Sequence, residues 1–188
     1  MDFYDDPNNV QIYLDMADGY DGRFLVEKLK EHLAAESSVL ELGMGPGKDQ
    51  LMLRESFKAT GSDRSHVFVD LFKAQYGGDH LLVLDAVDIN TDASFDGLYS
   101  NKVLQHLSSE EFIKSIERQY DLLNEGGILI HSFWAGEGEA FYDGLRFVYY
   151  TEATLKKAFE NKFEIIEMAH YKEEEAKDSI YIIAKKPL

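Results

Sequence analysis

The stretch Glu41-Leu42-Gly43-Met44-Gly45-Pro46-Gly47 decides the fold, because it sets three glycines at alternate positions directly after an apolar run. Residues 38 to 42 have the composition of a short strand, and residues 49 to 55 have helical spacing. A glycine turn between a strand and a helix lets backbone N–H groups come close to a ligand. We therefore expect a ligand crevice at the carboxyl end of this first strand.

The same alternation of strand and helix continues on both sides of the glycine turn. Further strands are expected at residues 57–62, 80–84, 95–99, 128–133, 163–168 and 179–184, and helices at 21–33, 64–76, 109–123 and 151–159. Alternating elements predict right-handed crossovers and parallel strands, whereas the last two strands have no helix between them and should form an antiparallel hairpin. The predicted fold is an α/β three-layer sandwich, with helices on both faces of a mostly parallel seven-stranded sheet.

The length of 188 residues fits a single domain spanning residues 1–188. Two segments lack a clear period: residues 1–20, expected to form an N-terminal lid, and residues 133–150, expected to form an insertion on the substrate side. The acidic start lacks the basic region of a signal peptide, and no apolar run reaches the ~18 residues of a membrane span. We expect a cytoplasmic protein without a membrane partner.

Charge and cysteine content exclude several classes of function. The chain has 19 basic and 35 acidic side chains, a formal net charge of −16, which repels phosphate backbones and argues against a nucleic-acid partner. The same excess of acids suits a cationic ligand, or serves only to keep the protein soluble. The chain has no cysteine, which excludes disulfides, thiolate metal sites and a cysteine nucleophile.

The glycine spacing separates two nucleotide-binding patterns. A dinucleotide fingerprint needs its third glycine one position later, where this chain has Lys48. Instead, Glu41-x-Gly43-x-Gly45-x-Gly47 resembles the signature turn of the class I S-adenosylmethionine-dependent methyltransferases. The resemblance extends in order over roughly residues 20–188, through the segments Gly61-Ser62-Asp63, Val83-Leu84-Asp85-Ala86, Phe95 to Ser100, Val103 to Leu107 and Leu122 to Gly127.

Two acids at strand ends have a role that follows from their position in the crevice. Asp63, twenty residues after Gly43, is placed to accept hydrogen bonds from both ribose hydroxyls. Asp85 can accept from an adenine amino group, with the Ala86 N–H beside it as a donor to the ring. A lone Asp is more often a helix cap or loop acid, and Asp88 competes with Asp85 for the adenine role.

The resemblance implies S-adenosylmethionine as cofactor and S-adenosylhomocysteine as product. It implies that the glycine turn passes the amino-acid part of the cofactor, that Glu41 supports that part or its surroundings, and that Ser100 lies along the methionine moiety. The expected cofactor-binding residues are therefore Glu41, Gly43, Gly45, Gly47, Asp63, Asp85, Ala86 and Ser100.

Methyl transfer from a sulfonium is an in-line displacement that depends mainly on holding the two reactants aligned, so it requires no metal. His106 is the first candidate for a base, although it could equally cap a helix or pack beneath the site. His131 lies inside an apolar strand and is expected to be a satisfied core histidine. The histidines show no metal-ligand spacing, and we predict no metal site.

Acceptor binding is expected between the two unpatterned segments. Tyr13 represents the N-terminal segment, and Trp134, Arg146 and Tyr150 represent the aromatic-rich insertion. The aromatic residues could line a largely apolar pocket with Arg146 holding an anion, or could form a small satellite core under a long loop.

The sequence therefore predicts an enzyme that methylates a small-molecule acceptor. Two alternatives remain: a cofactor-binding module without methyl-transfer activity that acts through a protein partner, and a protein methyltransferase.

Overall fold

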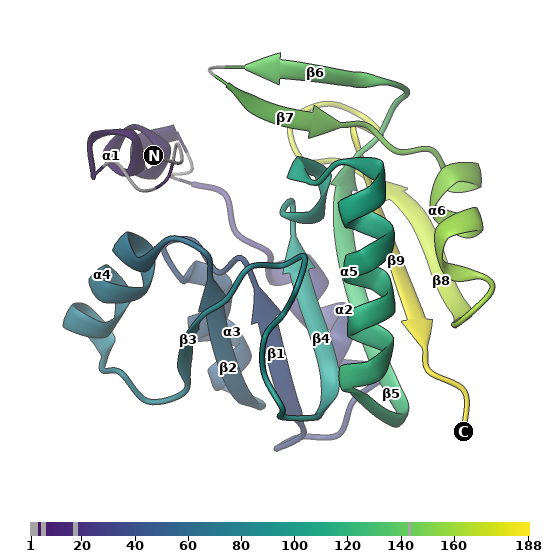
Figure 1. The fold of residues 1–188 in the computed structure, drawn as a ribbon, viewed down its shortest axis with the longest axis horizontal. Coiled ribbons are helices and arrows are strands. Elements are labelled where there is room, and N and C mark those ends of the chain that lie inside the picture. The colour runs from purple at the N-terminus through teal and green to yellow at the C-terminus, as the bar shows by residue number, and fades with distance from the viewer. Residues whose placement is uncertain (1–3, 5–6, 17–18, 143) are drawn as a thin grey trace.

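The structure, a computed structural model, describes residue 4 and residues 7–16, 19–142 and 144–188 (Figure 1). Its centre is a seven-stranded sheet in the order β3-β2-β1-β4-β5-β9-β8. The strands are β1 (Ser38–Leu42), β2 (Lys58–Asp63), β3 (Leu81–Val83), β4 (Phe95–Asn101), β5 (Leu123–Trp134), β8 (Glu164–Tyr171) and β9 (Ser179–Lys185). The pairs from β3 to β5 are parallel, and β9 runs antiparallel to both β5 and β8, as the sequence predicts.

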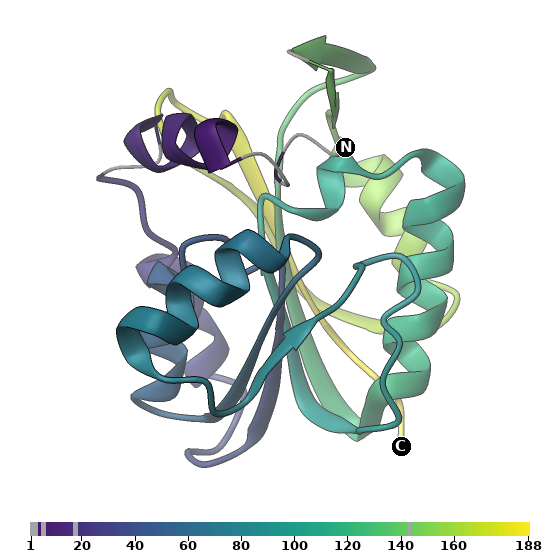
Figure 2. The same ribbon diagram turned by 60° about the vertical axis from the view of Figure 1, so that its left-hand side comes forward.

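Helices cover both faces of this sheet (Figures 1 and 2). They are α1 (Pro7–Met16), α2 (Arg23–Lys30), α3 (Lys48–Arg54), α4 (His66–Tyr76), α5 (Ser109–Leu122) and α6 (Glu152–Phe159), with a short 3-10 helix η2 (Leu104–His106) after β4. Helix α5 starts with a capping box formed by Ser108 and Glu111. None of the helices in the described ranges combines the length and the apolar character needed to cross a lipid bilayer.

Alternate residues of each strand supply the two halves of the core. Leu40 of β1 and Leu129 of β5 pack with α5 and α6, in a cluster that also contains Phe112, Phe133 and Phe159. Val39 and Ile130 point the other way and pack with α2 and α3, in a cluster that contains Leu25, Leu29 and Leu53. The helical layers therefore hold the sheet from both sides and fix the position of its carboxyl edge.

The two segments without a clear sequence pattern both contain regular structure. Residues 7–16 form α1, and the insertion contains an antiparallel hairpin of β6 (Glu139–Tyr142) and β7 (Leu145–Val148). Both lie beyond the carboxyl ends of the parallel strands (Figures 1 and 2). In the sequence, Asp143-Gly144 stands between two aromatic-rich runs, and this pattern is typical of a two-residue hairpin turn.

Candidate functional site

The glycine turn lies between β1 and α3, and its three glycines have different surroundings. All three have positive φ, at 70°, 49° and 84° for Gly43, Gly45 and Gly47. A Cβ on Gly43 would lie 2.5 Å from Val103, and one on Gly47 would lie 2.1 Å from the Phe72 ring, so these two glycines are required for packing. Among the described residues, a Cβ on Gly45 would meet the Tyr13 ring at 3.7 Å and nothing nearer. Gly45 is itself buried, so it is the glycine of the three that a Cβ would crowd least, beside the Tyr13 ring of α1.

Asp63 ends β2 and holds the glycine turn through its carboxylate. Its Oδ2 accepts from the Gly45 N–H at 2.9 Å and its Oδ1 from the Ser65 N–H at 2.8 Å. Burial raises the pKa of Asp63, and the two backbone hydrogen bonds act against that rise. The side chain expected to bind ribose thus also fixes the backbone beside it.

Two further acids lie close to Asp63 at the carboxyl edge of β1. Glu41 is 3% exposed, and its Oε2 is buried with no hydrogen-bond partner among the described residues. Burial raises the pKa of Glu41 well above its ordinary value, and the charges of Asp49 and Asp63 raise it further. The carboxyl edge of β1 therefore gathers acidic side chains. One buried acceptor atom there, Oε2 of Glu41, has no hydrogen-bond partner among the described residues.

Asp49 is the member of this group that the sequence analysis missed. It is buried in the first turn of α3 and accepts from the Gly22 N–H at 2.7 Å, the Tyr99 hydroxyl at 2.6 Å and the Asn101 amide at 3.1 Å. The available signal was an acid two residues after the last glycine of the turn, at a helix start where an anion is favoured. Asp49 joins the start of α2 to the ends of β4 and the glycine turn.

These residues fit S-adenosylmethionine on the chemistry of their donors and acceptors. The cofactor carries positive charge on its sulfonium and its amino group, and Glu41 offers an unsatisfied buried carboxylate oxygen close to Asp49 and Asp63. Gly45 has no side chain to keep a ligand from its backbone, which lies beside Asp63 and the Tyr13 ring. Glu41, Gly45 and Asp63 are thus the residues that would hold it.

The other residues expected to bind the cofactor differ in their exposure and in their hydrogen bonds. Asp85 is exposed and its Oδ1 accepts from the Val87 N–H at 2.7 Å, which leaves its second oxygen toward solvent. Ala86 is half-buried. Ser100 is fully buried and its hydroxyl pairs with His131 Nδ1 at 2.8 Å, so only its backbone is available to the crevice. His131 also pairs with Gln119, as a satisfied core histidine does.

His106, the candidate base, lies at the end of η2 next to β7. Its Nδ1 is 2.7 Å from the Arg146 carbonyl oxygen, and its ring meets the Phe147 ring edge-on at 4.7 Å. Burial lowers the pKa of His106, and the hydrogen bond to the carbonyl acts against that change. Burial therefore favours the neutral imidazole, which is the form that a base requires.

The residues expected to bind an acceptor are separated by the structure. Tyr13 lies by the glycine turn with Tyr4 and Phe68, and Trp134 lies under the Lys102 ammonium at 3.7 Å. The Arg146 guanidinium faces Glu139 at 3.6 Å.

Tyr150 is 6% exposed and packs on Phe112 and Phe133 within the main core. The chain returns to the sheet at that point through an isolated bridge between Ala135 and Tyr150. Phe141 and Tyr142, by contrast, are exposed, and the role of Tyr150 in acceptor binding stays a prediction.

Comparison with known proteins identifies the family. The model of the methyltransferase domain family matches residues 40–131, which run from β1 through the glycine turn to β5. The match supports a class I S-adenosylmethionine-dependent methyltransferase. The chain is 30% identical over 118 residues to the phosphoethanolamine N-methyltransferase of Plasmodium falciparum, a match that covers 59% of this chain and 44% of that enzyme.

Solved structures of methyltransferases share the fold. A 1,6-didemethyltoxoflavin-N1-methyltransferase from Burkholderia thailandensis has a TM-score of 0.80 at 20% identity, over 96% of this chain and 86% of that one. A methyltransferase from Clostridium acetobutylicum has a TM-score of 0.78 at 16% identity, over 95% of this chain and 99% of that one. At these identities the likeness establishes the architecture of this methyltransferase.

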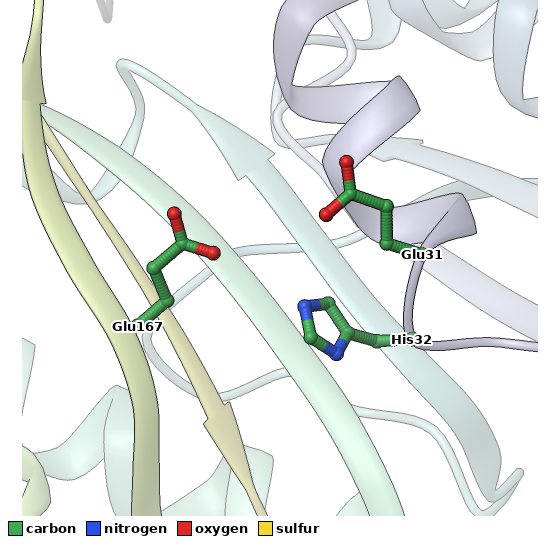
Figure 3. A group of neighbouring side chains, drawn as sticks. All are labelled: Glu31, His32 and Glu167. Atoms are coloured by element: carbon green, nitrogen blue, oxygen red, sulfur yellow. The ribbon is translucent and has the colours of Figure 1, made fainter.

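One group of side chains in the methyltransferase has metal-ligand composition. Figure 3 shows Glu31 and His32, after α2, facing Glu167 of β8, with one ligand atom of each within 4.8 Å of the others. The Lys28 ammonium already lies 3.4 Å from Glu31 and 3.2 Å from Glu167, and the Tyr181 hydroxyl donates to Glu167. The ammonium supplies the positive charge that these carboxylates need, and the absence of a metal site stays a prediction.

Proposed function

We propose that this chain binds S-adenosylmethionine at the carboxyl edge of β1 and β2 and transfers its methyl group to a small-molecule acceptor. The observation that carries the proposal is the buried Oε2 of Glu41, which has no hydrogen-bond partner among the described residues and lies in an acidic edge beside the glycine turn. A cationic ligand with a hydrogen-bond donor satisfies both features at once.

The proposed roles follow the position of each residue. Asp63 accepts from the ribose hydroxyls while it keeps the Gly45 N–H in place. Asp85 uses its free oxygen for the adenine amino group, and the Ala86 N–H lies beside it for the ring. Gly45 lets the amino-acid part pass close to the backbone, and Glu41 offsets its positive charge.

His106 is the proposed base. When bound, S-adenosylmethionine supplies a methyl group on a sulfonium whose sulfur leaves as a neutral thioether. The lone pair of the acceptor nitrogen or oxygen forms the new bond to carbon, and the electrons of the broken S–C bond stay on sulfur. His106 Nε2 takes the proton that the acceptor gives up, because Nδ1 is engaged by the Arg146 carbonyl.

The first acceptors to test are small amines. The curated relative is named a phosphoethanolamine N-methyltransferase, and the match spans less than half of that enzyme's length. A primary amine at pH 7 is an ammonium that must lose a proton before its nitrogen can attack, which gives His106 a defined task.

The test is transfer of a labelled methyl group from S-adenosylmethionine to a panel of small amines, alcohols and phenols by the purified protein. We expect transfer to at least one small molecule, and His106→Asn should lower kcat by about 10²- to 10⁴-fold with little change in cofactor affinity. Cofactor binding without transfer to any small molecule, together with transfer to a basic protein, would instead support the protein methyltransferase.

A further inference from the structure

The hydrogen bond between His106 and β7 fixes which ring nitrogen carries the proton. The partner of Nδ1 is the carbonyl oxygen of Arg146 at 2.7 Å, and a carbonyl oxygen can only accept. Nδ1 is therefore the donor. In a neutral imidazole this leaves Nε2 with a free lone pair, and Nε2 has no hydrogen-bond partner in the part of the chain that the structure describes.

Phe147, the residue after Arg146, fixes the orientation of the same imidazole. The two rings meet edge-on with centroids 4.7 Å apart and an interplanar angle of 78°. Phe147 is itself half-buried and held by the Tyr142 ring from the other strand of the hairpin, at 5.5 Å. One hairpin thus sets both the tautomer and the ring plane of His106.

The base of the β6–β7 hairpin joins it to the rest of the structure. Among the described residues, backbone hydrogen bonds there run from the Gly136 N–H to Tyr150 at 3.1 Å, from the Tyr150 N–H to Trp134 at 3.0 Å and from the Ala135 N–H to Asp178 at 2.8 Å. Beyond them the hairpin stands clear of the sheet and meets the chain again at η2 (Figures 1 and 2). The contact between His106 and β7 is therefore part of the packing of the hairpin on η2.

We propose that the β6–β7 hairpin is a positioning element for proton transfer, in which the Arg146 carbonyl and the Phe147 ring hold His106 as the Nδ1–H tautomer with Nε2 free toward the acceptor. This inference rests on the proposed function, since it gives His106 Nε2 the acceptor's proton. Arg146 acts through its backbone, and Phe147 is the side chain to test. The hairpin thereby couples docking of the insertion to the competence of the base.

The first experiment measures the tautomer directly, by long-range ¹H–¹⁵N correlation NMR of the ¹⁵N-labelled protein at neutral pH. The spectrum of His106→Asn identifies which of the six histidines is His106. We expect a single Nδ1–H form in the wild type and a mixture of tautomers in Phe147→Ala. An Nε2–H form in the wild type, or an unchanged Nδ1–H form in Phe147→Ala, would overturn the proposal.

The second experiment measures turnover on the same variants. Phe147→Ala should lower kcat by about tenfold to a hundredfold, through misplacement of the base, with unchanged cofactor Kd. Phe147→Tyr, which keeps a six-membered ring, should restore both kcat and the single tautomer. Phe141→Ala is the matched control, because Phe141 lies on the same hairpin, is 57% exposed and faces the Arg146 guanidinium rather than the imidazole.

The tautomer measurement and the turnover measurement together distinguish failure of the positioning role from failure of the proposed function. If the wild type has the Nδ1–H tautomer and Phe147→Ala disrupts it, but no acceptor is methylated, the positioning role stands and the proposed function fails. If methyl transfer occurs and Phe147→Ala retains full kcat, the proposed function stands and the positioning role is wrong. Loss of kcat in Phe147→Tyr as large as in Phe147→Ala, with both folded, would also contradict it.

Discussion

At the scale of residues, the acids of the crevice are held in an arrangement that suits binding better than stability. Glu41 has a buried oxygen with no hydrogen-bond partner in the described part of the chain, and its pKa is raised by burial and by Asp49 and Asp63. Sequence reasoning found Glu41 and Asp63 because both occupy fixed places relative to the glycines. It did not find Asp49, because the role of Asp49 depends on Gly22, Tyr99 and Asn101, which only the folded chain brings together.

Glu41→Gln should stabilise the protein without its cofactor. Because the pKa of Glu41 in the folded state is raised above its ordinary 4.5, folding favours the protonated form, and stability falls as pH rises above that value. The glutamine amide does not ionise, so the variant does not lose this stability at pH 7. Each increase of about 1 kcal/mol in the free energy of unfolding corresponds to about 2–4 °C in Tm. Calorimetric melting at pH 5 and pH 7.5 tests it, with the larger gain at pH 7.5 and weaker cofactor binding expected.

An unchanged melting temperature at both pH values would show that Glu41 costs the apo protein nothing. A gain of the same size at pH 5 as at pH 7.5 would show that its charge is not the cause.

Gly45→Ala should separate ligand contact from folding. The new Cβ meets nothing closer than the Tyr13 ring at 3.7 Å, so the cost is that of a left-handed backbone, about 1–2 kcal/mol. We expect a folded variant with cofactor affinity lowered at least tenfold, measured by isothermal titration calorimetry.

Gly47→Ala is the matched comparison, since its Cβ would lie 2.1 Å from the Phe72 ring and should lower Tm strongly. Wild-type cofactor affinity in Gly45→Ala would mean that the ligand does not approach the backbone at Gly45.

At the scale of elements, the sequence predicts the sheet well and the covering segments poorly. The β1 strand has the predicted bounds of residues 38–42, because a short apolar run ended by glycine leaves little freedom. The β6–β7 hairpin and α1 were missed, because neither buries an amphipathic face in the main core that would impose a period on its sequence. Their placement depends on contacts with η2 and α4.

Removal of residues 1–15 should change the kinetics of cofactor binding. The structure sets Tyr13 of α1 beside Gly45, and the Ser65 hydroxyl donates to the Tyr4 carbonyl, so this N-terminal segment lies against the glycine turn and the start of α4. Both the association and the dissociation rate should rise in the truncated protein, as measured by stopped-flow fluorescence. Equal association and dissociation rates in the truncated and full-length proteins would mean that residues 1–15 do not cover the cofactor site.

The pH dependence of turnover follows from η2 and the hairpin together. Burial lowers the pKa of His106 below its ordinary 6.5, and the base is active only when neutral. The value of kcat should therefore be constant above pH 7 and fall at lower pH, with a midpoint below 6.5. A midpoint above 7 that disappears in His106→Asn would contradict the environment described for His106.

At the scale of the whole molecule, the excess of acids acts on any charged ligand. With a formal charge of −16, the protein attracts S-adenosylmethionine, which carries one net positive charge more than S-adenosylhomocysteine. Raising the salt concentration from 20 to 300 mM should weaken binding of S-adenosylmethionine more than binding of S-adenosylhomocysteine. Calorimetric titrations with both ligands at the two salt concentrations test this, and equal salt dependence would limit the acids to a role in solubility.

The central claim is that the carboxyl edge of β1 and β2 binds the adenosyl cofactor through Asp63. The most direct test is a calorimetric titration of the wild type and Asp63→Asn with S-adenosylhomocysteine. Asparagine keeps an acceptor oxygen for one of the two backbone N–H groups that Asp63 holds and loses the other, so melting of the variant must first show that it is folded. Loss of a charge-assisted hydrogen bond of about 1.5–3 kcal/mol predicts a Kd about tenfold to a hundredfold weaker. The same Kd in a folded Asp63→Asn, or no binding to the wild type, would contradict the account.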